Sequence, residues 1–148
     1  MEKKDLKPAG VFKYFEEICQ VPRPSKKEEK IIAYLKAFGA KHNLETKVDE
    51  AGNVLIKKPA TPGKENLQTV VLQSHIDMVC EKNNDVQHDF LTDPIETEID
   101  GEWLKAKGTT LGADNGIGVA TELAILADDS IEHGPLECLF TVDEETGL

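Results

Sequence analysis

A histidine and an aspartate stand two residues apart directly after an apolar run. His75 and Asp77, in SHIDMV, follow the segment TVVLQS. In an extended chain, residues i and i+2 point to the same side, so this imidazole and this carboxylate can face one cavity. A metal-bound histidine commonly donates its second ring N–H to a carboxylate, which fixes the tautomer. For the pair alone, an ordinary hydrogen-bonded strand exit is the more common interpretation.

A second candidate is the glycine-rich segment GTTLGADNGIGVA, which carries Asp114 just before an expected helix. Glycine-rich loops before helices often bind phosphate. An aspartate inside the loop opposes that interpretation, no Gly-Lys-Ser/Thr follows, and the glycine spacing differs from the dinucleotide fingerprint. Two interpretations stay open: Asp114 or Asn115 caps the helix, or a rigid loop holds the Asp114 carboxylate where it bridges two cations.

The third candidate is a pair of adjacent carboxylates, Glu144 and Glu145, behind the apolar run PLECLFTV. Neighbouring side chains on an extended segment diverge, so the two acids cannot easily chelate one ion in the same way. They can divide the work, one binding a metal and the other accepting a proton from water. Considered alone, two solvated acids in an acid-rich chain are the more common interpretation.

Together, the three candidates predict one site. Two of them follow apolar strands and the third opens a helix, which is where the ligand sites of open α/β sheets gather. One imidazole and several carboxylates, with no thiolate, suit a catalytic zinc, manganese or cobalt ion better than a structural zinc. The remaining histidines, His42, His88 and His133, lie in polar stretches and are expected at the surface.

The amino-terminal part of the chain predicts two helices. Apolar side chains recur with helical spacing over residues 9–20. Pro22 and Pro24 then end the helix, because proline cannot continue its hydrogen bonding. Ser25 followed by Glu28 has the pattern of a capping box, which predicts the start of a second helix.

Strand patterns dominate the middle of the chain. Residues 44–48 alternate in polarity, EAGN is a turn and NVLIKK a return strand, so a hairpin is expected. TVVLQS is a short, nearly unbroken apolar run, typical of a strand buried on both faces. Asp100-Gly101 indicates a second hairpin. With a helix after GTTLGADNG and a strand at PLECLFTV, the order predicts a layered α/β domain with a mixed sheet.

Composition bounds the class of protein. The 148 residues have the length of one ordinary domain. The 17 basic residues are scattered among 28 acidic ones, for a net charge of -11, which makes nucleic acids and anionic membranes poor partners. No secretory signal or membrane span is apparent, so a cytoplasmic protein is expected. Cys19, Cys80 and Cys138 are far apart and are expected to be reduced thiols of the core.

Three segments in this order, SHIDMVCEKNND, IDGEWLKAKGTTLGADNGIGVA and HGPLECLFTVDEETG, resemble the amino-terminal part of the aminoacyl-histidine dipeptidases, also called cytosol non-specific dipeptidases. These enzymes belong to the wider group of dinuclear zinc aminoacylases and carboxypeptidases. The resemblance implies a layered α/β/α catalytic domain of zinc-peptidase type. It also implies two zinc ions per complete active site, with cobalt or manganese as other possible metals, and hydrolysis of dipeptides, including those ending in histidine.

The resemblance also implies a role for each candidate residue. His75 would bind one metal, with Asp77 as the catalytic acid that orients it, and Asp114 would bridge both metals. Glu144 would be the general base and Glu145 a ligand of the second metal. In this family the peptide bond after the bridging aspartate, here Asp114-Asn115, is often cis.

Members of the family are much longer than this chain. A further aspartate and a distal histidine complete their metal sites, and an inserted domain supports dimerisation and covers the substrate. The resemblance therefore predicts that residues 1–148 are the amino-terminal part of the catalytic domain, incomplete at the C-terminus, without the inserted dimerisation and lid domain. Such a fragment is expected to be nearly inactive, and the full-length enzyme a homodimer. A related N-acyl-amino-acid deacylase and a non-catalytic interaction module remain alternatives.

Overall fold

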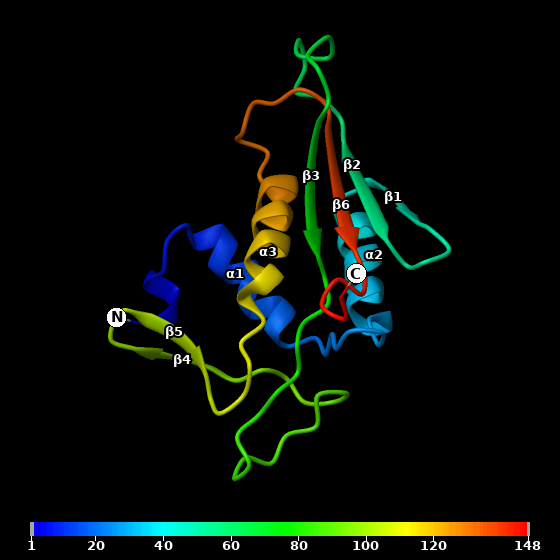
Figure 1. The fold of residues 1–148 in the computed structure, drawn as a ribbon. Helices are drawn as coiled ribbons and strands as arrows, with labels where there is room; N and C mark the ends of the chain where they lie inside the picture. The colour runs from blue at the N-terminus through cyan, green and yellow to red at the C-terminus, as the bar shows by residue number, and fades with distance from the viewer. Residues whose placement is uncertain (1, 148) are drawn as a thin grey trace.

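A four-stranded sheet, a separate two-stranded hairpin and three α-helices make up residues 2–147, the part of the chain that the computed structural model describes (Figure 1). The elements in chain order are η1 (Lys3–Asp5), α1 (Ala9–Cys19), α2 (Glu29–Lys41), β1 (Glu45–Val48), β2 (Val54–Lys58), β3 (Val70–His75), β4 (Thr97–Asp100), β5 (Trp103–Ala106), α3 (Ala113–Ala127) and β6 (Leu136–Thr141). Apart from the short η1, this is the predicted order. None of the helices within the described residues has the length and apolar character to cross a bilayer.

The sheet is mixed, as predicted, and β6 occupies its interior. The strand order is β1-β2-β6-β3, in which β6 runs antiparallel to β2 and parallel to β3. The parallel pair places His75, the last residue of β3, opposite Thr141, the last residue of β6. Because parallel strands end at the same edge of a sheet, the segments that follow β3 and β6 emerge side by side (Figure 1).

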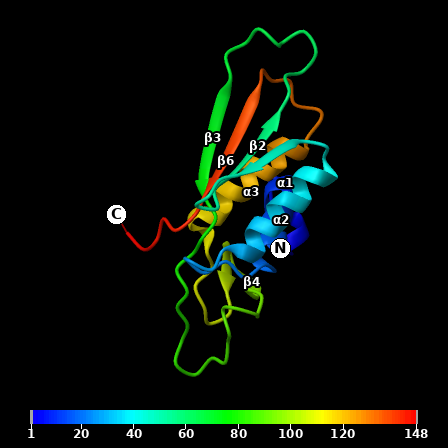
Figure 2. The same cartoon turned by 90° about the vertical axis from the view of Figure 1, so that its right-hand side faces the viewer.

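The helices lie against one face of this sheet (Figure 2). Burial alternates along β6, where Leu136, Cys138 and Phe140 are buried beneath the helices and the residues between them are half-buried. This alternation is what a strand covered on one side produces. The α/β class is confirmed. Among residues 2–147 no helix covers the opposite face, so the third layer of the expected α/β/α arrangement stays a prediction.

The expectation that TVVLQS is buried on both faces was wrong. In the described part of the chain β3 is an edge strand, paired only with β6. Val70 and Val71 are 50% and 57% exposed, and burial is complete only at Ser74 and His75. An apolar run does not distinguish an edge strand from a central one, because both the number of neighbouring strands and the covering layers are set by the rest of the fold.

The open edge of β3 predicts self-association. An exposed apolar edge strand offers unpaired backbone groups to another chain, and a charge on it blocks such pairing. We therefore expect the chain to associate and to bind the dye ANS, and Val71→Lys to reduce both in sedimentation and fluorescence measurements. Ile131→Lys adds the same charge at an exposed position outside the sheet and should leave association unchanged. A monodisperse wild-type chain that is silent towards ANS would contradict this prediction.

The predicted capping box was also wrong. Helix α2 begins at Glu29, and Glu28 precedes it without a side-chain hydrogen bond to the helix. The hydroxyl of Ser25 instead donates to Asp77 Oδ2 at 2.6 Å. A fully buried carboxylate needs donors more than an exposed helix terminus does, because water can satisfy the terminus.

The cysteines and the other histidines fall partly where they were expected. Cys19 and Cys138 are buried and Cys80 is half-buried, and all three are free thiols. The three remaining histidines are half-buried rather than fully exposed. One reason is local packing of their rings: His42 lies against Phe38, and His88 against Phe90.

Candidate metal centre

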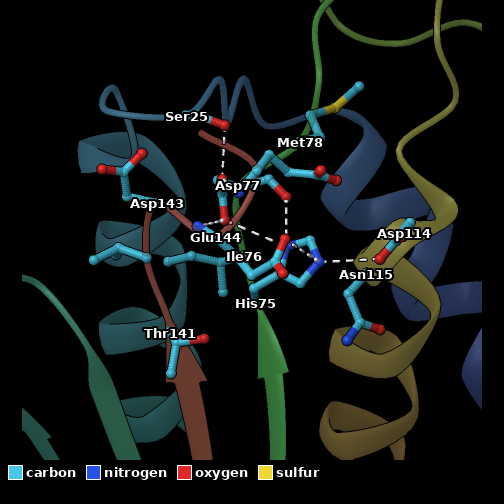
Figure 3. Close-up of polar contacts among 12 residues, drawn as sticks. Ser25, His75, Ile76, Asp77, Met78, Asp114, Asn115, Thr141, Asp143 and Glu144 are labelled. Atoms are coloured by element: carbon cyan, nitrogen blue, oxygen red, sulfur yellow. Dashed lines mark hydrogen bonds and ion pairs between the residues drawn. The ribbon is translucent and has the colours of Figure 1, made fainter. Parts of the chain in front are cut away.

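His75 is the central residue of the site, held at the end of β3 (Figure 3). The side chain is almost completely buried, and each ring nitrogen faces a different partner. Nδ1 lies 3.1 Å from the backbone oxygen of Asp77 and 3.3 Å from its Oδ1. Nε2 lies 3.0 Å from Asp114 Oδ1 and 3.7 Å from Glu144 Oε2. The predicted pairing of His75 with Asp77 is therefore present, and Nε2 points at the other candidate acids.

Asp77 links the segments that follow β3 and β6. Its carboxylate is fully buried, and besides the Ser25 hydroxyl it accepts the backbone N–H groups of Glu144 and Glu145, each at 3.1 Å. Burial alone would raise the pKa of Asp77, but the hydrogen bonds from Ser25 and these two N–H groups, with the nearby His75, hold that pKa below its ordinary value. Asp77 is thus a fixed negative charge behind the imidazole.

Glu144 and Glu145 lie in a turn and not in the extended segment that was assumed. Asp143, just before them, has a positive φ of 55°, and its backbone N–H donates to Glu28 Oε1 at 3.0 Å. The turn removes the divergence expected of neighbours on a strand. Both carboxylates consequently reach the space in front of His75.

Asp114 approaches His75 from the opposite side, at the start of α3 (Figure 3). Asp114 and Asn115 have non-helical backbone angles, and the peptide bond between them is cis, as the resemblance implied. Asp114 makes no capping hydrogen bond, whereas Asn115 Oδ1 accepts the N–H of Gly118 at 3.2 Å. The capping interpretation therefore fits Asn115, while the 85% exposed Asp114 side chain is directed to His75.

Three donor atoms converge where a cation can bind. One atom each from His75, Asp114 and Glu145 lies within 4.8 Å of the others. An imidazole nitrogen and two carboxylates form a hard donor set without thiolate, which fits zinc, manganese or cobalt. A second group, Glu28, Asp77 and Asp143, is equally close, but the protein already donates hydrogen bonds to Glu28 and Asp77. The first group is the better cation site.

The charges around His75 favour a positive species at its Nε2. Burial lowers the pKa of His75, but the hydrogen bond to Asp114 and the negative charges of Asp77 and Glu144 outweigh it and raise that pKa above its ordinary value. A proton and a metal ion compete for the same imidazole nitrogen. The acids that stabilise the protonated ring would equally stabilise a bound cation.

Sequence reasoning missed two residues that support the site. Local pattern predicts a helix cap for Ser25 and no role for Arg23. Arg23 is the only arginine in the sequence and is 2% exposed, although basic side chains are rarely buried. A single arginine between two prolines, in a chain whose other basic residues are all lysines, is the one signal that could have drawn attention to it.

Comparison with known proteins agrees with this geometry. The family model described as peptidase family M20/M25/M40 matches residues 71–148. The cytosol non-specific dipeptidase of Escherichia coli (strain K12) is 52% identical over 147 residues, which are 99% of this chain and 30% of that protein.

Solved structures of peptidases also resemble this chain. An aminoacylhistidine dipeptidase from Vibrio alginolyticus matches with a TM-score of 0.95 and 54% identity, over 99% of this chain and 30% of that one. The aminopeptidase PepT from Bacillus cereus matches with a TM-score of 0.76 and 25% identity, over 93% of this chain and 37% of that one. The chain thus spans about a third of the length of these proteins.

Proposed function

The chain belongs to peptidase family M20/M25/M40, and from this premise we propose that it supplies metal ligands and the general base of a metal-dependent dipeptidase. The observation that carries the proposal is the convergence of His75, Asp114 and Glu145 within 4.8 Å, with Glu144 beside them. Two relatives that are more than half identical are both named as dipeptidases, which supports the choice of reaction.

Each residue has a role that follows from its position. His75, Asp114 and Glu145 would hold divalent cations, zinc in the first instance, with Asp114 exposed enough to serve two of them. When bound, such cations acidify water and polarise a carbonyl group. Asp77 keeps the imidazole of His75 oriented through Nδ1. Glu144, whose side chain is 57% exposed, takes a proton from the attacking water and returns it to the leaving amine.

Substrate, assembly and location are part of the proposal. Dipeptides, including Xaa-His, are the expected substrates, which the names of the Escherichia coli and Vibrio alginolyticus relatives support. Residues 1–148 would form the amino-terminal part of a catalytic domain whose remaining ligands lie in segments beyond these residues. A homodimer and a cytoplasmic location complete the proposal, the latter supported by the name of the relative from Escherichia coli.

Added metal is expected to stabilise the chain. A ligand that binds only the native state adds about 2.7 kcal/mol to the free energy of unfolding when its free concentration is 100 times its Kd. We therefore expect zinc or manganese to raise the melting temperature, measured by calorimetry, and a chelator to reverse the rise.

Asp114→Asn is the matched control for this experiment. The side chain is exposed and the substitution keeps its size, so folding should be little affected while a cation ligand is lost. The variant is expected to melt close to the metal-free wild type and to gain little from added metal. A melting temperature that ignores zinc and manganese in both proteins would favour the alternative of a metal-free interaction module.

A further inference from the structure

Arg23 lies in the linker between α1 and α2, where it contacts both halves of the site. Its guanidinium Nη1 donates to the backbone oxygen of Ile76 at 3.1 Å, and Nη2 donates to the backbone oxygen of Gly112 at 2.6 Å. Ile76 directly follows His75 in the sequence, and Gly112 lies two residues before Asp114. One side chain therefore joins the segment that carries the imidazole to the segment that carries the carboxylate.

The surrounding backbone keeps the guanidinium in place. The N–H of Met78 donates to the backbone oxygen of Arg23 at 3.1 Å, and Pro24 forms a parallel bridge with Met78. The linker thus runs along the exit of β3. Gly112 O also accepts the N–H of Gly116 at 3.0 Å, so the carbonyl held by Arg23 closes the first turn of α3 around Asp114.

Two glycines leave the space that the guanidinium fills. A Cβ on Gly112 or on Gly116 would lie 2.6 Å from Nη2 of Arg23. Gly112 also has a positive φ of 73°, whereas the backbone of Gly116 accepts any residue. The closely packed space accommodates a planar group that donates hydrogen bonds in two directions. A guanidinium meets this requirement better than the ammonium group of lysine.

We propose that Arg23 is a positioning residue that holds His75 and Asp114 at contact distance by bridging the carbonyls of Ile76 and Gly112. No other described side chain donates to both of these segments. The positioning acts in the metal-free chain. Its consequence for cation binding rests on the proposed function.

Two variants remove the bridge by different routes. Arg23→Met keeps an unbranched side chain and leaves no buried charge, while the carbonyls of Ile76 and Gly112 lose their donor. Gly116→Ala keeps Arg23 but places a methyl group 2.6 Å from the present position of Nη2, so the guanidinium must move. Each variant has a matched control remote from the site. Lys58→Met removes a lysine that bridges the carbonyls of Ile125 and Asp128 at the other end of α3. Gly10→Ala adds a methyl group that meets only Ala124 Cβ, at 3.6 Å.

The first measurement uses the metal-free chain at one fixed pH. Ring ¹⁵N signals of His75, recorded by NMR, report the hydrogen bonds of both nitrogens, and the other three histidines serve as internal references. We expect the His75 signals to shift in Arg23→Met and in Gly116→Ala and to stay at their wild-type positions in both controls. If Arg23→Met fails to fold, Gly116→Ala decides the question. Unchanged His75 signals in the folded site variants, or equal shifts in the controls, would overturn the proposal.

The second measurement titrates each protein with Co²⁺ and follows its visible absorption. Loss of a residue that orients metal ligands typically weakens metal affinity about 10- to 100-fold, and we expect this for both site variants and for neither control. Wild-type affinity in both site variants would count against the positioning role. A wild-type chain that binds no Co²⁺, together with shifted His75 signals in the site variants, would refute the proposed function and leave the positioning role intact.

Discussion

Changing Glu144 to glutamine is expected to lower kcat for dipeptide hydrolysis about 10²- to 10⁴-fold, with little change in KM. Glutamine has the size of glutamate and keeps one acceptor oxygen, but it cannot take up a proton. The loss therefore falls on the step in which water attacks the peptide carbonyl. The proposed role of Glu144 in this step rests on its position, since its Oε2 lies 3.7 Å from Nε2 of His75, beside the candidate cation site and not within its donor set.

A chimera provides the setting for this measurement. The aligned 147 residues of this chain can replace the matching part of the Escherichia coli dipeptidase, since the two are 52% identical over that length. Glu132→Gln, at a position that is 74% exposed and precedes β6 whereas Glu144 follows it, is the matched control and should keep full activity. Equal kcat values for the chimera and its Glu144→Gln variant would exclude Glu144 as the base. Substantial hydrolysis by the 148-residue chain alone would show that no further ligands are needed.

The second large effect concerns a buried acid outside the site. Glu122 projects from α3 towards the sheet, is 3% exposed, and its Oε2 has no hydrogen-bond partner among the described residues. Burial raises the pKa of Glu122 to about 7, although the neighbouring Ser74 hydroxyl and Cys138 thiol act in the opposite direction. An ionised carboxylate without a partner is costly in an apolar interior, so the folded protein favours the protonated acid.

Stability is therefore expected to fall as pH rises through this range. The folded state holds the Glu122 proton up to a pKa of about 7, whereas the unfolded chain releases it near 4.5. Between these two values the folded state binds more protons, so the free energy of unfolding decreases with pH. At 1.36 kcal/mol per pKa unit the loss amounts to roughly 3 kcal/mol. The stability that comes from the Glu122 proton is complete below the pKa of the unfolded chain and absent above the pKa of the folded state.

Urea unfolding of the wild type and of Glu122→Gln across pH 4.5 to 8 isolates this contribution. Histidines titrate in the same range, but they do so in both proteins and cancel in the difference. We expect the free energy of unfolding of the variant, relative to that of the wild type, to increase steadily from pH 4.5. Above neutrality the difference should become constant. Glu137→Gln, on the half-exposed face of β6, should show no such trend. A pH-independent difference between wild type and Glu122→Gln would disprove the assignment.

The meeting of the site residues could be predicted from the sequence, because it depends on local pattern. Apolar runs ending at His75 and before Glu144 indicated two strand exits, and a glycine-rich loop with Asp114 indicated a helix start. The carboxyl ends of parallel strands and the helix starts near them gather at one edge of an α/β sheet. The structure brings these residues together by that rule.

The supporting contacts could not be predicted, because they join segments far apart in the chain. The hydrogen bond from Ser25 to Asp77 spans 52 residues, and the one from Arg23 to Gly112 spans 89. Local pattern predicted for Ser25 the more common role of capping a helix terminus. The edge position of β3 was missed for the same reason, since it depends on which strands lie beside it. The turn at Asp143 was missed because a single residue with positive φ leaves little trace in a short segment.

The interior position of β6 has a consequence for how the chain folds. The sheet order β1-β2-β6-β3 means that β2 and β3, which are made first, do not pair with each other and are joined only when β6 pairs with both. The backbone of Glu144 then reaches Asp77 across 67 residues, which is a contact of high sequence separation. Contacts of this kind slow folding, because a long loop must close before any of them forms. On the ribosome, β2 and β3 would therefore remain unjoined until β6 is made, and the proposed metal ligands would be the last part of the fold to come together.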